Sequence, residues 1–114
     1  MAEPAHLRLV ERQTRAFNHG VRTGEWAPLV ALFAEDAELR FENAPAGPFV
    51  GRDAIRRAYE EQPPRDEIVL LGAQTESEGK LTAAFAWASG GTGRMLVEHR
   101  DGAIERLTVV FDEH

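Results

Sequence analysis

Two adjacent side chains near the C-terminal end of the sequence have types suited to proton transfer. Glu98 and His99 lie next to each other in a segment whose apolar residues alternate as in a strand. Histidine can act as a general base near neutral pH, and a carboxylate can do so when burial raises its pKa. A buried Glu98 would need a cationic partner, which Arg94 or Arg106 could provide. Glu98 and His99 are therefore candidate catalytic residues, with an exposed Arg–Glu pair and a rim histidine as the alternatives.

Other catalytic arrangements are weakly supported. No two of the four histidines are three or four residues apart, so we expect no metal site. Neither serine lies in a G-x-S-x-G motif. The glycine-rich segment 90–93 precedes a strand pattern rather than a helix, so we interpret it as a hairpin loop and expect no cofactor. Because the chain contains no cysteine, disulfides and thiol nucleophiles are excluded.

Composition indicates one domain over residues 1–114. The net charge is −6 and the basic residues are scattered along the sequence. Nucleic-acid binding is not expected, because phosphate neutralisation requires a concentrated basic face. The first residues, MAEPAHLRLVERQ, contain no long apolar stretch, so we expect no signal peptide, no membrane contact and a cytoplasmic location.

The first half of the sequence predicts helices around one short strand. Apolar residues recur at helical spacing from Leu7 to Val21, in a helix that begins near Pro4 and ends between Gly20 and Gly24. A second helix is expected from Glu25 to about Phe33. Alternation at residues 38–42 indicates a strand, and residues 43–51 form a loop rich in proline and glycine, in which Phe49 and Val50 could make a brief strand. A third helix is expected over residues 52–62.

The second half predicts four strands, over residues 68–75, 81–89, 94–100 and 104–111. The Asp101-Gly102 pair favours a tight hairpin, and consecutive hairpins give a mostly antiparallel sheet in an α+β layout. Because these strands are apolar on both faces, we expect a second copy of the chain to cover part of the sheet as a homodimer. The alternative is that single apolar residues lie exposed.

Aromatic residues recur at core-like spacing throughout the sequence. Each of them is explained by ordinary packing when taken alone. Together they predict an aromatic pocket wall with few polar groups, which suits a hydrophobic small molecule. The expected wall residues are Phe17, Trp26, Phe41, Tyr59, Phe85, Trp87 and Phe111.

Three segments, LFAEDAELRF, PFVGRDAIRRAY and ERLTVVFDEH, resemble the nuclear transport factor 2-like superfamily, and most of all its SnoaL-like and ketosteroid-isomerase-like group. The resemblance implies a cone, in which a strongly bent mixed or antiparallel sheet wraps around N-terminal helices, as in cystatin-like α+β barrels. It also implies an apolar internal pocket and, commonly, a homodimer. Such proteins include isomerases, cyclases, hydrolases, dehydratases and non-catalytic binders, so the resemblance fixes no reaction.

The resemblance also implies which residues an isomerase of this group would need. These are an aspartate base, plus a tyrosine and a protonated aspartic acid that donate hydrogen bonds to the oxyanion. Alignment with this chain places Phe41, Phe17 and Leu96 at those positions, and none of them can transfer a proton. Leu96 thereby joins the expected pocket wall. A shift of one residue in this alignment would make Glu42 the base, although strand alternation places Glu42 on the face opposite to that of Phe41.

Two hypotheses follow from these observations. In the first, the chain is a pocket protein for a hydrophobic, polycyclic or polyketide-like molecule, either a binder or an isomerase-, cyclase- or hydrolase-type enzyme. Its acid–base groups would then come from Glu42, Tyr59, Glu98 and His99. In the second, the chain is a non-catalytic module whose pocket is filled by its own aromatic side chains. An open cavity that a carboxylate or imidazole reaches would favour the first hypothesis.

Overall fold

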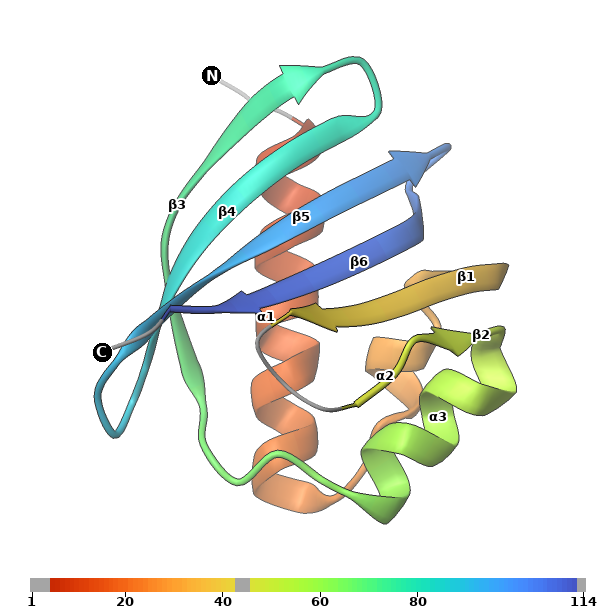
Figure 1. Ribbon diagram of the computed structural model, residues 1–114, viewed down its shortest axis with the longest axis vertical. Coiled ribbons are helices and arrows are strands. Elements are labelled where there is room, and N and C mark those ends of the chain that lie inside the picture. The colour runs from red at the N-terminus through yellow and green to blue at the C-terminus, as the bar shows by residue number, and fades with distance from the viewer. Residues whose placement is uncertain (1–4, 43–45, 113–114) are drawn as a thin grey trace.

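The computed structural model describes residues 5–42 and 46–112 and has the expected α+β fold. One curved six-stranded sheet, in the order β2-β1-β6-β5-β4-β3, packs against three helices (Figure 1). The helices are α1 (Ala5–Thr23), α2 (Ala27–Val30) and α3 (Arg52–Glu61). The strands are β1 (Phe33–Glu42), β2 (Phe49–Val50), β3 (Ile68–Ser77), β4 (Lys80–Trp87), β5 (Thr92–Arg100) and β6 (Ala103–Phe111). In the described residues, no helix is long and apolar enough to cross a membrane.

Consecutive hairpins connect β3 to β6, which confirms the mostly antiparallel arrangement. At the Asp101-Gly102 turn both residues have positive φ, 53° and 79°, as a type I′ hairpin requires. One pair differs, because β1 lies parallel to β6. The chain can make this parallel pair because α3 and four strands separate β1 from β6 in sequence.

The second helix is shorter than the sequence predicted. Helix α2 has only four residues, and Phe33 begins β1 instead of ending the helix. The backbone N–H of Ile104 donates to the carbonyl of Leu32 at 2.8 Å, so the chain joins the sheet directly after α2. Pairing with β6 thus overrides the helical spacing of Leu29, Val30 and Phe33.

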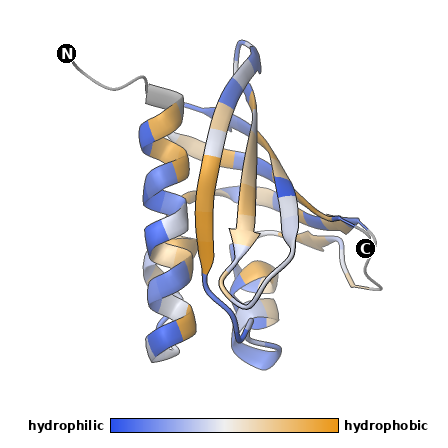
Figure 2. Cartoon of the chain, turned by 90° about the vertical axis from the view of Figure 1, so that its left-hand side faces the viewer, coloured by the Kyte–Doolittle hydropathy of each residue, from blue (hydrophilic) through white to orange (hydrophobic). Residues whose placement is uncertain are grey.

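Helix α1 lies along the concave side of the sheet, as Figure 2 shows in a view turned by 90°. It buries an apolar face that includes Leu9, Val10 and Phe17. The side chain of Asn18 fastens it to the start of β3. Its Nδ2 donates to the carbonyl of Ile68 at 2.9 Å, and the Ile68 N–H donates to its Oδ1 at 2.8 Å. These two bonds fix the position of α1 across the sheet edge.

Helix α3 is fixed to β1 at its first residues. The N–H of Gly51 donates to the carbonyl of Ala37 at 2.7 Å, and Gly51 has a φ of 90° that favours glycine. The Arg52 Nε donates to the carbonyl of Phe33 at 2.8 Å. With its start held in this way, α3 buries Ile55 and Tyr59.

Candidate functional site

A cavity of about 520 Å³ lies between α1, α3 and the concave face of the sheet. Its volume is within the range of roughly 300–1,000 Å³ that is usual for small-molecule pockets. The second hypothesis required the protein's own aromatic side chains to fill the hollow, whereas this cavity is open. Six of the eight residues expected in the pocket wall line it: Phe17, Phe41, Tyr59, Phe85, Trp87 and Phe111.

Aromatic rings from three strands stack along the cavity wall. Trp87 and Phe111 are nearly parallel, with ring centroids 6.0 Å apart, and Phe111 stacks on Phe41 at 6.1 Å. Phe17 of α1 approaches Trp87 at 6.4 Å, and Phe85 meets Trp87 edge-on at 5.2 Å. Parallel flat faces and ring edges of this kind are suited to packing against a flat apolar ligand.

Two residues expected in the wall lie elsewhere. Trp26 is buried behind the wall, where it stacks on Tyr59 with centroids 5.0 Å apart. Leu96 lies on the outer face of the sheet and is 40% exposed, whereas its neighbour Met95 lines the cavity. The placement of Leu96 in the wall was wrong by one residue, because successive side chains of a strand point to opposite faces.

The candidate catalytic residues Glu42, Glu98 and His99 are not among the side chains that line the cavity. Glu42 is exposed at the end of β1. Glu98 accepts a hydrogen bond from Arg106 Nη1 at 2.9 Å on the outer face. The backbone N–H of His99 donates to the carbonyl of Gly79, beside the β3–β4 turn. The exposed Arg–Glu pair is thus the alternative that the structure supports for Glu98.

Arg106 also bonds to a second carboxylate, that of Glu38 on β1, at 3.3 Å. Glu98 and Glu38 together raise the pKa of the Arg106 guanidinium. Because all three side chains are partly exposed to solvent, this cluster stabilises the sheet weakly. Its carboxylates are already engaged in ion pairs and face away from the cavity.

The ionisable groups that do line the cavity favour binding over proton abstraction. Burial raises the pKa of Tyr59 well above its ordinary value, so its hydroxyl stays protonated at neutral pH. Asp66 lies at the cavity mouth, where the Ser89 hydroxyl and the Ser89 N–H both donate to it and lower its pKa. A carboxylate with a lowered pKa is a poor general base near neutral pH.

Sequence reasoning missed Gln13, which is a polar group in the cavity wall. Gln13 is 2% exposed and lines the cavity from α1. A signal was present, because Gln13 follows Val10 by three residues and precedes Phe17 by four, which places it on the apolar face of the helix. Asp66 and Ser89 carried no comparable signal, since they are 23 residues apart in irregular segments.

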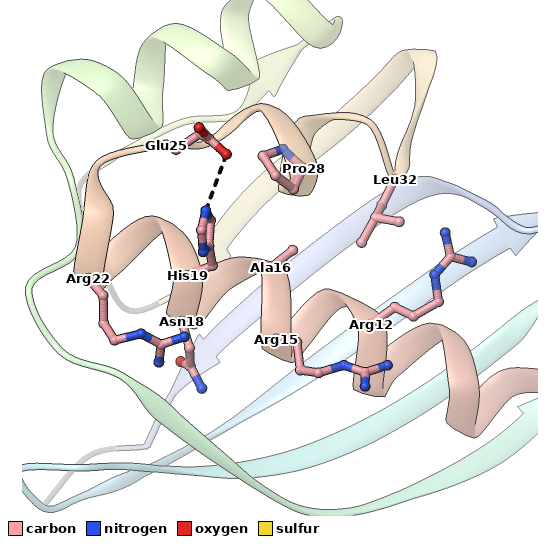
Figure 3. Close-up of a pocket in the computed structure, with 9 residues that line it drawn as sticks. All are labelled: Arg12, Arg15, Ala16, Asn18, His19, Arg22, Glu25, Pro28 and Leu32. Atoms are coloured by element: carbon pink, nitrogen blue, oxygen red, sulfur yellow. Dashed lines mark hydrogen bonds and ion pairs between the residues drawn. The ribbon is translucent and has the colours of Figure 1, made fainter.

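A second hollow lies on the outer side of α1, where arginines and a histidine surround a shallow groove (Figure 3). His19 pairs with Glu25 at 3.2 Å, and Arg22 pairs with Glu67 at 2.5 Å. The charged ends of Arg12 and Arg15 point in different directions from the helix and do not converge on one point. The aromatic cavity, which is the more enclosed of the two, is therefore the better candidate site. Among the described residues, no cluster of three or more histidine and acidic side chains is arranged to hold a metal ion.

Comparison with protein families finds that a model of the SnoaL-like domain matches residues 14–111. That range runs from the middle of α1 to the end of β6. No curated protein matches the sequence.

Solved structures with the same fold include a candidate polyketide cyclase from Xanthomonas campestris pv. campestris. It is 23% identical with a TM-score of 0.72, and the match covers 95% of this chain and 90% of that one. A candidate ketosteroid isomerase from Kribbella flavida is 21% identical with a TM-score of 0.67, covering 90% and 79%. A de novo designed protein with a curved β-sheet is 17% identical with a TM-score of 0.72, covering 98% and 88%. At these identities the likeness concerns the fold alone.

Proposed function

The chain belongs to the SnoaL-like domain family, and we propose that it binds a flat, hydrophobic small molecule in its aromatic cavity. The observation that carries the proposal is the wall of stacked rings contributed by Trp87, Phe111 and Phe41. Binding would remove exposed ring faces from water, and this burial would supply most of the affinity. Phe85 meets Trp87 edge-on and Phe17 meets it at a tilt, so these two rings would narrow the space beside Trp87 and favour a planar ligand.

The polar groups of the cavity support recognition rather than acid–base turnover. Tyr59 is held in its protonated form, and its hydroxyl has no hydrogen-bond partner among the described residues. It is thus available to donate to an oxygen atom of a ligand. Glu42, Glu98 and His99 remain candidates for catalysis only if a ligand reaches outside the cavity. We therefore propose a binding function ahead of an isomerase-, cyclase- or hydrolase-type reaction.

A cavity-filling variant tests the proposal. Ala58 lines the cavity from α3 and is half-buried, so Ala58→Phe should occupy part of the hollow while keeping the core intact. Arg57→Phe adds the same ring at the adjacent, exposed position and is the matched control. We expect a panel of steroids, aromatic polyketides and aromatic acids to contain a ligand that raises the melting temperature of the wild type and of Arg57→Phe, but not of Ala58→Phe.

Two outcomes would contradict the proposal. One is that no panel compound stabilises the wild-type chain. The other is that Ala58→Phe binds a compound as tightly as the wild type, which would place the ligand elsewhere. Glu42→Gln and Glu98→Gln should leave ligand affinity unchanged, because both side chains lie outside the cavity. Loss of a measurable turnover in either variant would instead support an enzyme.

We also propose that a second copy of the chain covers the outer face of the sheet. Val69, Leu71 and Leu96 are exposed there to 57%, 59% and 40%. The nearby Arg106 cluster carries both charge signs, so two copies related by a two-fold axis could pair opposite charges. We expect Leu96→Arg to shift sedimentation toward a monomer, while Glu60→Arg on the exposed side of α3 does not. A wild-type chain that sediments as a monomer at high concentration would rule out this dimer.

A further inference from the structure

Gln13 is an unusual residue for the position that it occupies. It lies on the buried face of α1 between Val10 and Phe17 and is 2% exposed. Glutamine is mostly found at protein surfaces, because its amide needs several hydrogen-bond partners. Here the side chain contributes to the wall of the aromatic cavity instead.

The amide of Gln13 is only partly satisfied within the described part of the chain. Its Nε2 donates to the Met95 sulfur at 3.3 Å, and its Oε1 is buried without a partner. A thioether sulfur can accept a hydrogen bond but cannot donate one, so the amide nitrogen must face Met95 and the carbonyl oxygen is left over. A buried acceptor without a donor is unfavourable. Because Gln13 lines the cavity, a rotation of its amide would bring this oxygen within reach of a donor on a ligand.

The two ends of the cavity differ in exposure. Gln13 and Met95, each 2% exposed, form part of its buried end. Arg65 and Ser89 are exposed and contribute to its mouth. A ligand that enters past the mouth would place one end against the Gln13 amide while its middle packs against the aromatic rings.

We propose that Gln13 is the hydrogen-bond anchor of this cavity and selects a flat aromatic ligand with a hydroxyl group at its leading end. This inference rests on the proposed binding function and specifies its ligand class. The oxygen of Gln13 accepts, so the ligand must donate. An ionised carboxylate cannot donate, and no cationic side chain is among the residues at the buried end to compensate its charge. Phenols and alcohols are therefore favoured over aromatic acids.

Two probes of almost equal shape separate the anchor from simple hydrophobic binding. 2-Naphthol carries a hydroxyl where 2-methylnaphthalene carries a methyl group. Gln13→Met removes the amide and keeps a long unbranched side chain. Thr14→Val is the matched control, because the Thr14 hydroxyl is also buried without a partner but Thr14 is not among the residues that line the cavity. Affinities are measured by calorimetry for the wild type and both variants.

We expect the ratio of naphthol to methylnaphthalene affinity to fall about tenfold in Gln13→Met, as loss of one neutral hydrogen bond implies. The affinity for methylnaphthalene should stay close to that of the wild type, and Thr14→Val should keep the wild-type ratio. In the wild type, naphthol should shift the NMR signals of the Gln13 side-chain amide more than methylnaphthalene does. This last measurement requires no variant and is informative even if Gln13→Met does not fold.

The outcomes distinguish failure of the Gln13 proposal from failure of the proposed binding function on which it rests. If both probes bind but the affinity ratio is the same in Gln13→Met, the anchor is wrong and the binding function stands. If the Gln13 amide signals respond equally to both probes, the anchor is likewise wrong. If neither probe binds the wild-type chain and the larger panel also fails, the binding function fails and the anchor with it.

Discussion

The two faces of the sheet carry different chemistry, although the same strands form both. On the concave face, Phe85, Met95 and Leu107 are almost completely buried and line the cavity. On the convex face, Glu98 and Arg106 form an ion pair that water partly screens. The candidate catalytic residues Glu98 and Glu42 thus lie outside the cavity, whose wall is mainly apolar and aromatic.

Truncating a ring on the concave face should have the largest effect. Phe85 is 1% exposed, so Phe85→Ala leaves a void and loses apolar burial, and we expect it to lower the free energy of unfolding by about 3–5 kcal/mol. On the convex face, Leu96→Ala should cost less than about 1 kcal/mol, because Leu96 is 40% exposed. Urea denaturation of both variants measures the difference. Equal losses of unfolding free energy would mean that the two faces do not differ in how tightly their side chains are packed.

A single methyl group tests how tightly the concave face is packed. A Cβ added at Gly93 would lie 2.5 Å from Phe85 Cζ and 2.8 Å from the Val110 carbonyl oxygen. Gly93→Ala should therefore destabilise the chain by about 1–3 kcal/mol. Gly72→Ala is the control, since nothing lies within 4 Å of its Cβ position and alanine suits a strand better than glycine. Thermal unfolding that ranks Gly72→Ala below Gly93→Ala in stability would contradict this packing.

The raised pKa of Tyr59 predicts a loss of stability at alkaline pH. A tyrosine whose pKa is raised on folding stabilises the native state fully below its unfolded pKa of about 10, and this contribution is lost as pH rises above that value. Tyr59→Phe should therefore unfold less readily than the wild type near pH 11 and differ little from it at neutral pH. Tyr59 is the only tyrosine, so tyrosinate absorbance reports on it alone. Titration of this signal at an ordinary pKa would refute the burial of the hydroxyl.

Removing the ion pairs of the convex face should have the smallest effect. Arg106→Met keeps the aliphatic stem but loses both carboxylate partners, Glu98 and Glu38. Since these groups are partly exposed, we expect a melting-temperature change well below that of Gly93→Ala, and smaller still at high salt. A large change that salt does not weaken would show that the cluster is more buried than its exposure indicates. Glu76→Gln, on an exposed side chain of β3 that makes no ion pair with the described residues, is the control.

Most of the fold followed from the sequence, because hydrophobic periodicity and turn chemistry are local. The Asp101-Gly102 pair fixed a type I′ hairpin, and with it the pairing of β5 and β6. The end of α2 at Val30 could not be derived in this way. It depends on β6, whose Ile104 lies more than seventy residues further along the sequence and bonds to the chain directly after α2.

Residue types and their spacing were enough to predict an α+β chain rich in aromatic residues. Tertiary structure alone decided which side chains share the cavity. Whether Met95 or Leu96 faces inward depends on a strand register of one residue. Gln13 and Met95 are 82 residues apart in sequence, and only the packing of α1 across β5 brings their side chains into contact.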